Sequence, residues 1–257
     1  MSDLTPAARQ RRMLAMLDEH GQITVRRAAH ELGVSDDTVR RDLDALHASG
    51  LLVRTHGGAI RPDPGAGGVP LASRRITRRE AKERIARAAV GLVPDGATLL
   101  MNGGSTVLAV AAALGGRREL IVITNNLLLP GRLPEGVARE VYLLGGMVRR
   151  DGEVTLGPVE LPARPPIPLA ADVAVLGVGG LSERGFSAVN LAEAQMVAEM
   201  TAVSARVVVV CDTSKFARDV LALGGTLDTV DLLVTDAAPS GALGRALRRA
   251  GVEVVVA

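Results

Sequence analysis

The chain of 257 residues has almost no aromatic side chains: one tyrosine, two phenylalanines and no tryptophan. Proteins that bind RNA or single-stranded DNA usually stack bases on aromatic side chains, and this composition provides no such platform. If the chain binds nucleic acid, its composition therefore favours double-stranded DNA.

Cysteine is equally scarce, since Cys211 is the only one. A single cysteine excludes a disulfide framework, and its place after the apolar run "VVVV" predicts a small buried side chain instead of a reactive thiol. The N-terminal stretch lacks the apolar segment of a signal peptide, and no apolar run reaches the roughly 20 residues that span a bilayer. We therefore expect a cytoplasmic protein without a membrane partner.

Excess charge of one sign is also missing, because the formal net charge is only +2. Overall charge therefore does not indicate a nucleic-acid partner, and only local clusters could do so. One cluster lies at residues 74–87, where seven basic residues accompany two glutamates. Thr77 and Glu80 form the pattern of a capping box and predict a helix from there to about Leu92. We interpret its basic side chains as a solvated helix face beside a linker.

Three short helices are predicted in residues 1–61. Thr5 and Pro6 can start the first, and Gly21 ends it. The second covers about 25–32. After a turn containing glycine, Ser35 can cap a third helix that continues to about His47, and a β-hairpin follows. This order is typical of a winged helix-turn-helix, a DNA-binding domain.

The third helix would present its polar side chains to DNA. An α-helix fits the major groove, where arginines can contact phosphates or guanine edges and hydroxyls can contact backbone oxygens. Asp36 and Asp37 suit the helix N-terminus but would repel phosphate, so they either orient the arginines or limit nonspecific binding. The predicted DNA contacts, including two from the hairpin, are Ser35, Thr38, Arg40, Arg41, Arg54 and His56.

Residues 62–73 are rich in proline and glycine and predict a linker, followed by a second domain over 74–257. Apolar runs in that domain alternate with amphipathic segments. Runs that are apolar on both faces and separated by helices indicate a parallel sheet covered on both sides. The predicted strands are 97–101, 120–124, 140–144, 172–178, 206–211, 231–235 and 252–256, with helices at 106–114, 191–203 and 241–250.

Glycine and hydroxyl side chains follow several of these strands. Open parallel sheets bind ligands outside the carboxyl ends of their strands. The stretch "NGGST", residues 102–106, leads from a strand directly into a helix. Its glycines would let backbone N–H groups approach an anion that the helix N-terminus favours, and Lys215 could add a counter-charge. A phosphate site and a simple tight turn are both open readings of this stretch.

Cofactor and metal signals are weak. "GVGGLSERG", residues 177–185, is a poor dinucleotide fingerprint because it has no glycine at its sixth position and no acid placed for a ribose. All four histidines lie in the N-terminal part, without the spacing of metal ligands. We expect neither a cofactor nor a metal.

Residues 21–59 closely resemble the DNA-binding segment of DeoR-type bacterial transcription regulators. They contain that family's Val-Ser turn, its Thr-Val-Arg-Arg-Asp-Leu recognition helix and its Arg-x-His-Gly-Gly-Ala wing. Residues 74–256 are similar to the family's sensor domain, with "NGGST", "TN", "GG" and "DTSKF" at the ends of strands. The resemblance implies an α/β fold of the ribose-5-phosphate isomerase-like type for this second domain.

The resemblance also implies a function. A DeoR-type regulator, in most cases a repressor, would bind a double-stranded DNA operator as a homo-oligomer, a dimer or a tetramer, and respond to a phosphorylated sugar or a related metabolite. The implied effector residues are Asn102, Gly104, Ser105, Thr106, Thr124, Asn125, Asp212 and Lys215.

Several positions depart from the family's pattern. The usual aspartate of the first loop is Asn102, Gly179 replaces an acid, and Val197 and Ala198 stand at basic positions, although Glu193 is kept. The phosphate half of the site is therefore expected to be preserved and the half that contacts sugar hydroxyls to be altered.

Two alternatives use the same residues. The chain could be an isomerase or deaminase acting on a sugar phosphate, but such proton transfers need a positioned acid and base, and Asn102 and Gly179 remove two carboxylates. It could also be a DNA-binding regulator whose second domain only assembles the oligomer.

Overall fold

The computed structural model describes residues 5–48, 51–55, 57–60, 71–159 and 169–257. The chain divides into two compact units, residues 1–77 and 78–257. Each unit has its own hydrophobic core and is described by itself.

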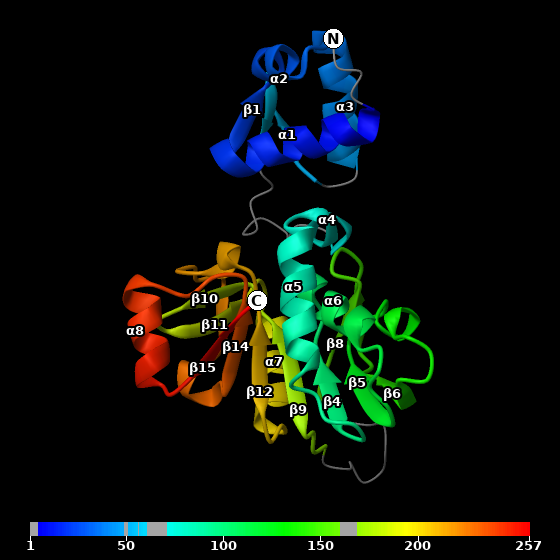
Figure 1. The fold of residues 1–257 in the computed structure, drawn as a ribbon, viewed down its shortest axis with the longest axis vertical. Helices are drawn as coiled ribbons and strands as arrows, with labels where there is room; N and C mark the ends of the chain where they lie inside the picture. The colour runs from blue at the N-terminus through cyan, green and yellow to red at the C-terminus, as the bar shows by residue number, and fades with distance from the viewer. Residues whose placement is uncertain (1–4, 49–50, 56, 61–70, 160–168) are drawn as a thin grey trace. The chain divides into compact units, whose positions relative to one another are not determined.

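The described part of the first unit contains three helices and a small antiparallel sheet, followed by the short helix α4 (Leu71–Ile76) at its end (Figure 1). The helices are α1 (Pro6–His20), α2 (Val25–Leu32) and α3 (Asp36–Ala48), and the strands are β1 (Gln22–Thr24), β2 (Val53–Thr55) and β3 (Gly58–Ile60), in the order β1-β3-β2. The three predicted helices and the hairpin are confirmed. Strand β1 was not predicted, because three residues are too few to show an alternating pattern.

The predicted helix ends of this unit are formed as expected. The Thr5 hydroxyl accepts a hydrogen bond from the N–H of Ala8, and Gly21 closes α1 in the left-handed conformation. Gly58 permits the pairing of β1 with β3, since a Cβ at this position would lie 1.9 Å from the carbonyl oxygen of Ile23. The core beneath gathers apolar side chains of all three helices, with Met13 and Leu43 fully buried.

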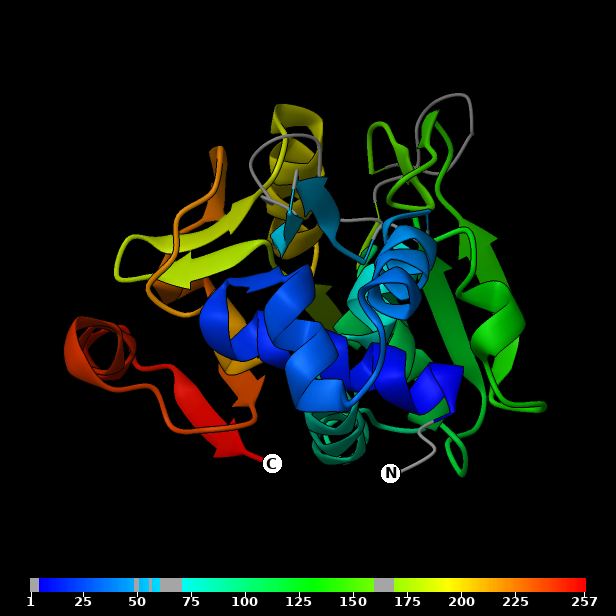
Figure 2. The same ribbon diagram turned by 90° about the horizontal axis from the view of Figure 1, so that it is seen from above.

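The second unit is built on a seven-stranded parallel sheet in the order β15-β14-β12-β9-β4-β5-β6. Figure 2 shows β15, in red, at one edge and the green strands at the other. All seven strands correspond to the seven predicted runs, with ends that differ by at most two residues. They are β4 (Thr98–Met101), β5 (Leu120–Thr124), β6 (Ala138–Leu143), β9 (Val173–Gly177), β12 (Val207–Val210), β14 (Leu232–Thr235) and β15 (Glu253–Val256).

Helices cover both faces of this sheet, as predicted. Successive strand residues point to opposite faces, so Leu99 joins one core and Leu100 the other. The first core includes α5 (Arg79–Val90) and α6 (Ser105–Ala113), and the second includes α7 (Leu191–Ala202) and α8 (Gly241–Arg249). Two hydrophobic layers therefore hold the strand ends in fixed relative positions.

Short elements outside the main sheet were not predicted. Strands β7 (Met147–Arg149) and β8 (Val154–Leu156) form a hairpin, and β10 (Gly180–Ser182), β11 (Gly185–Ala188) and β13 (Ala222–Gly225) form a small antiparallel sheet. The 3₁₀ turns are η1 (Pro130–Arg132), η2 (Thr213–Lys215) and η3 (Leu227–Thr229). Three- and four-residue strands rich in glycine leave too little periodicity to detect.

The start of the second unit differs from the sequence expectation. Leu71 to Ser73, placed in the predicted linker, belong to helix α4 (Leu71–Ile76), and the boundary between the units falls four residues after the predicted one. The capping box was wrong: the Thr77 hydroxyl donates to the carbonyl of Ser73, and Arg78 occupies the N-cap of α5 with φ of 51°. Thr77 thus completes the turn of α4 and cannot cap α5.

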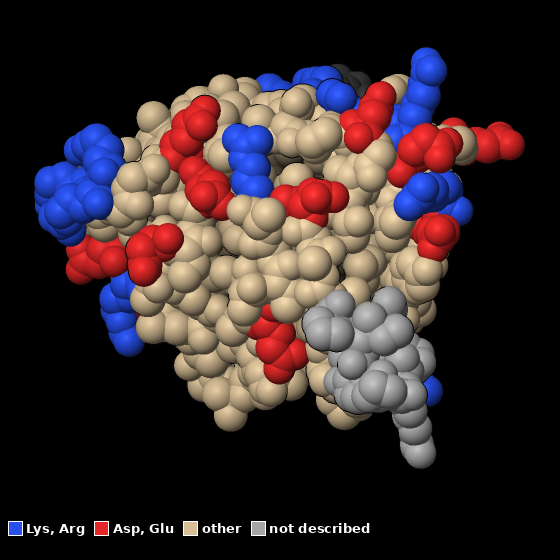
Figure 3. Space-filling view, turned by 90° about the horizontal axis from the view of Figure 1, so that it is seen from below, with Lys and Arg blue, Asp and Glu red and all other residues tan. Residues whose placement is uncertain are grey.

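The face shown in Figure 3 is mainly uncharged, with scattered acidic and basic side chains. Basic side chains gather at its left edge. The last turn of α8 carries Arg248 and Arg249. Among the described residues, no helix is both long and apolar enough to cross a membrane.

Candidate functional site

The start of α3 is fixed by a small hydroxyl pair. Ser35 caps the helix, since its Oγ accepts the N–H of Thr38 at 3.2 Å, and it lies 2.9 Å from the hydroxyl of Thr38. The predicted cap is therefore confirmed. Both predicted contact residues lie at the same helix end, and their hydroxyls already share one hydrogen bond.

The two predicted arginines of α3 have different surroundings. Arg40 donates a hydrogen bond to Asp37 Oδ1 at 2.8 Å and lies 4.0 Å from Asp36 Oδ2. Arg41 is exposed and has no hydrogen bond or ion pair among the described residues. Arg41 is thus ready to meet an external anion, whereas Arg40 must first leave its aspartates.

A third acid of the same helix is structural. Asp42 is buried and accepts hydrogen bonds from Arg9 and from Gln10, both on α1. Asp42 therefore ties α3 to α1. The charged run of this helix therefore divides between the core and the surface.

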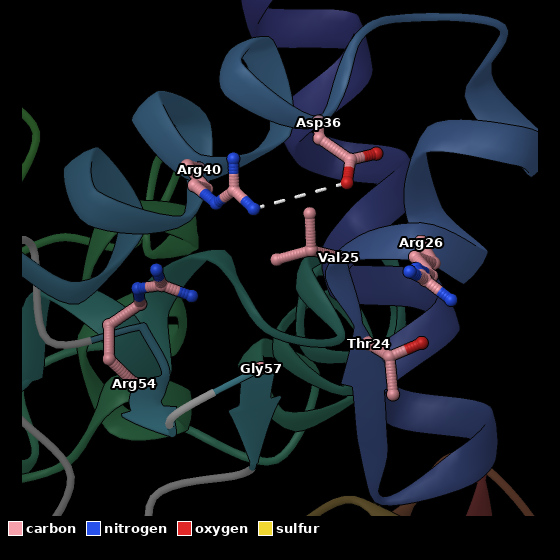
Figure 4. Close-up of a pocket in the computed structure, with 7 residues that line it drawn as sticks. All are labelled: Thr24, Val25, Arg26, Asp36, Arg40, Arg54 and Gly57. Carbon is pink, nitrogen blue, oxygen red and sulfur yellow. Dashed lines mark ion pairs between the residues drawn. The ribbon is translucent and has the colours of Figure 1, made fainter.

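An open groove of about 360 Å³ lies between α2, α3 and the hairpin (Figure 4). Arg40 and Arg54 stand on one side and Arg26 on the other, with Asp36 above and Val25 at its base. Arg26 is exposed, has no partner among the described residues, and was not singled out in the sequence. Arg26 and Arg54 suit a phosphate backbone, whereas Arg40 shares the groove with the carboxylate of Asp36.

The hairpin holds its arginine rigidly. Arg54 donates to Asp44 of α3 at 2.8 Å and to the carbonyl of Gly58 at 2.6 Å. These bonds link the hairpin to the recognition helix, so the two present their side chains as one surface. His56, also a predicted contact, lies outside the described residues.

In the second unit, Asn102 joins two strand ends. Its side-chain amide donates to the carbonyl of Gly177 at 2.9 Å, and its Oδ1 accepts the Gly177 N–H at 2.7 Å. Asn102 is 2% exposed and both ends of its carboxamide are used. Asn102 therefore holds the ends of β4 and β9 together, and this structural role accounts for both of its hydrogen bonds.

The glycine loop after Asn102 lies under the β7–β8 hairpin. A Cβ at Gly103 would meet Val154 Cγ1 at 2.1 Å, so only glycine fits beneath β8. Gly104 is the N-cap of α6 and supplies no side-chain cap. Ser105 and Thr106 form the first turn of α6. No side chain of the N-cap residue accepts a hydrogen bond from the first N–H groups of this helix.

The end of β5 carries two buried amides. Thr124 donates to the carbonyl of Met101 at 2.7 Å, which joins β5 to β4. Asn125 donates from Nδ2 to the carbonyl of Thr155 on β8, but its Oδ1 is buried without a hydrogen-bond partner. The same holds for Nδ2 of Asn126. Because buried polar atoms are nearly always satisfied, an unpaired acceptor and an unpaired donor on consecutive residues indicate a missing partner.

A charged cluster that sequence reasoning missed lies at the ends of β12 and β14. Asp212 is buried, accepts the N–H of Ser214 and lies 3.7 Å from Arg78 and 3.9 Å from Lys82. Arg78 also bonds Thr213 and lies 3.6 Å from Asp236. Lys82 is only 6% exposed. The interpretation of residues 74–87 as a solvated face was therefore wrong at Lys82, which is buried because α5 begins at the carboxyl edge of the sheet, whereas Arg78 pairs with these acids and is still exposed.

The predicted effector residues share one edge of the sheet but form two groups. Asn102, Gly104 and Asn125 lie at β4 and β5, whereas Asp212 and Lys215 follow β12. Strand β9 separates β4 from β12, so two strand spacings, about 10 Å, divide the groups. A ligand would have to span the two groups to contact both.

The other sequence candidates have structural places. Burial, followed by the nearby Asp212 carboxylate, raises the pKa of the Cys211 thiol, so Cys211 is an inert core residue as predicted. A Cβ at Gly179 would lie 2.9 Å from the carbonyl of Ser187, which leaves no room for an acid without a backbone shift. Glu193 pairs with Arg149 of β7 at 3.3 Å. Within the described ranges, no cluster of three metal-ligating side chains occurs.

Two family models match the chain. Residues 9–64 match the DeoR-like helix-turn-helix domain, and residues 77–237 match the DeoR C terminal sensor domain. The HTH-type transcriptional repressor GlcR of Bacillus subtilis is 32% identical over 250 residues, 96% of each chain. The glycerol-3-phosphate regulon repressor of Escherichia coli is 32% identical over 229 residues, 88% of this chain and 89% of that one.

Among solved structures, ribose 5-phosphate isomerase from Plasmodium falciparum matches with a TM-score of 0.38 and 14% identity, over 53% of this chain and 52% of that one. A likeness this distant says nothing of activity. The sequence matches extend over both units and agree with the helix-turn-helix and the parallel sheet. The chain therefore belongs to the DeoR family of transcriptional regulators, and it is not an enzyme.

Proposed function

We propose that this regulator is a cytoplasmic repressor that binds operator DNA through α3 and the hairpin, and that a phosphorylated sugar or related metabolite lowers its operator affinity. The observation that supports a ligand at the sheet edge is the pair of unsatisfied buried amide atoms on Asn125 and Asn126. The Asn125 atom lies beside the glycine loop, since a Cβ at Gly103 would be 3.8 Å from Asn125 Oδ1.

The chemistry of this edge suits a phosphorylated compound. The uncapped start of α6 offers N–H groups to a phosphate near Gly104, Ser105 and Thr106. Asn125 offers an acceptor that a sugar hydroxyl can satisfy. Arg78, Lys82 and Lys215 against Asp212 and Asp236 leave one positive charge in excess at the second group. A ligand of sugar-phosphate length can span the roughly 10 Å between the groups.

A screen of phosphorylated sugars tests this function. A compound at 100 times its Kd should add about 2.7 kcal/mol to the free energy of unfolding and release bound operator DNA. Lys215→Ala should leave DNA binding intact and weaken the response to the compound. If no phosphorylated sugar stabilises the protein, the effector proposal is wrong; if Lys215→Ala responds normally, the ligand does not reach the second group.

We also propose that the regulator is a homo-oligomer, and that β6 joins two copies. Strand β6 is an edge strand, and Val141, Tyr142 and Leu143 are 41%, 38% and 46% exposed. Exposed, unpaired edges readily pair with another strand. An antiparallel pair of β6 strands centred on Val141 would place Glu140 opposite Tyr142 of the second copy, and these side chains already hydrogen-bond within one strand. The strand is thus complementary to itself.

A further inference from the structure

The recognition helix has two acids arranged around one arginine. Asp37 accepts a hydrogen bond from Arg40 and Asp36 flanks the same guanidinium within the groove of Figure 4. We propose that Asp36 and Asp37 withhold Arg40 from DNA phosphates and release it only to a base edge, which makes them determinants of sequence specificity. The proposal rests on the contact of α3 with DNA.

Charge favours this division. Two carboxylates and one guanidinium sum to −1, and all three side chains are accessible, with exposed fractions of 44%, 74% and 53% for Asp36, Asp37 and Arg40. A phosphate approaching Arg40 therefore meets net repulsion. The O6 and N7 atoms of guanine accept hydrogen bonds but carry only partial negative charge, so they attract the guanidinium and are repelled by the carboxylates less than a phosphate is.

Magnitudes point the same way. An exposed ion pair resists separation by roughly 1.5- to 5-fold, and Arg40 has two such neighbours. One phosphate contact strengthens binding by about fivefold at 0.15 M salt, from its salt slope of about 0.9. A bidentate contact with guanine is worth roughly 5- to 150-fold. Losing both pairs costs roughly 2- to 25-fold. This loss is comparable with the gain from a phosphate contact, and only a strong base contact exceeds its whole range.

Arg41 provides an internal contrast. It lies next to Arg40 in the sequence but about 100° away around the helix, with no ion pair among the described residues. Nothing holds it back from phosphate. The two neighbouring arginines are thus expected to act differently on the same duplex, Arg41 in all complexes and Arg40 only in matched ones.

A four-protein cycle tests the proposal. The wild type, Arg40→Ala, Asp36→Asn/Asp37→Asn and the triple variant are titrated with a random-sequence 30-base-pair duplex at several salt concentrations. Arg40→Ala alone should have the same slope of log K against log salt as the wild type. Asp36→Asn/Asp37→Asn should steepen that slope by about 0.9, and adding Arg40→Ala should remove the increment. The ratio of affinities for a duplex selected in vitro by the wild type and for the random-sequence duplex should fall by about fivefold in the double variant.

Glu19→Gln is the matched control for Asp37→Asn. Both carboxylates are 74% exposed and both lie in the first unit, but Glu19 is on α1 and does not touch Arg40. Glu19→Gln should not change the slope.

The proposal is overturned if Arg40→Ala flattens the wild-type slope, or if the acid variants bind more tightly to the same extent with and without Arg40. Loss of all duplex binding in Arg40→Ala/Arg41→Ala would support the α3 contact independently, and full retention would remove that contact instead.

Discussion

The side chains of Arg41 and Asn102 differ in how many hydrogen bonds hold them. Arg41 is exposed on α3, and the described residues offer it no partner. Asn102 shows the opposite case, because both ends of its carboxamide are used by the backbone of Gly177. Each environment leads to its own prediction.

Arg41→Ala is expected to weaken binding to an operator by about 1–3 kcal/mol if Arg41 makes a bidentate base contact. If it meets a phosphate, the salt slope should instead become flatter by about one. Fluorescence anisotropy over a range of salt concentrations separates the two results. An affinity equal to that of the wild type at every salt concentration would place Arg41 outside the interface.

Asn102→Asp is expected to destabilise the second unit by about 1–3 kcal/mol at pH 7. The substitution removes the donor to Gly177 and brings a buried carboxylate against a carbonyl oxygen. Burial and the facing carbonyl oxygen of Gly177 raise the folded-state pKa of the new carboxyl above its unfolded value, although the Gly177 N–H still donates to it. The lost stability should therefore return as the pH falls through that raised pKa, and the recovery should be complete below about 4. Urea unfolding at several pH values measures this, and a deficit independent of pH would contradict the account.

At the scale of elements, the β7–β8 hairpin determines access to the sheet edge. It bonds the end of β5 through Asn125 and Thr155, rests on Gly103 through Val154, and is tied to α7 through Arg149 and Glu193. One short hairpin therefore covers the glycine loop and lies beside the unsatisfied amides. The response to a ligand should depend on its seating.

Gly103→Ala tests that seating. The new methyl group would lie 2.1 Å from Val154 Cγ1, so β8 must move and we expect a loss of roughly 1–3 kcal/mol in unfolding free energy. Val154→Ala removes that contact and should restore most of the loss in the double variant. Thermal unfolding of both single variants and the double variant provides the comparison, and simple additivity of the two losses would show that the clash is not the cause.

At the scale of the whole molecule, two units of the chain carry two tasks, and oligomerisation is expected to connect several copies. Dimeric helix-turn-helix proteins place paired recognition helices on paired half-sites, which is why we propose that this regulator holds two copies together. The exposed apolar edge of β6 is the surface that we propose for this contact.

Val141→Lys should therefore disrupt the oligomer. In a pair centred on this position, two lysines would face each other, and like charges directly opposite are destabilising. Light scattering coupled to size-exclusion chromatography should show a smaller species than for the wild type. Val256→Lys, on the opposite edge strand and 52% exposed, is the control and should keep the wild-type mass.

Local patterns in the sequence were enough to predict the helix-turn-helix and the seven parallel strands. Helix caps such as Ser35 and apolar runs depend on neighbours within a few residues, and a sheet covered on both faces leaves continuous apolar segments. The family motifs identified the two domains for the same reason, since each motif is contiguous.

Only the tertiary structure decided what each polar side chain does. It brought Arg78 and Lys82 to Asp212 across 134 and 130 positions of the chain. It also bonded Asn102 to Gly177 and gave Arg40 and Arg41 different surroundings. These contacts are set by strand order and helix orientation, which bring distant residues within a few ångströms. The sequence around a charged or amide residue does not show which distant residue it will contact. The role of such a side chain therefore became clear only from the fold.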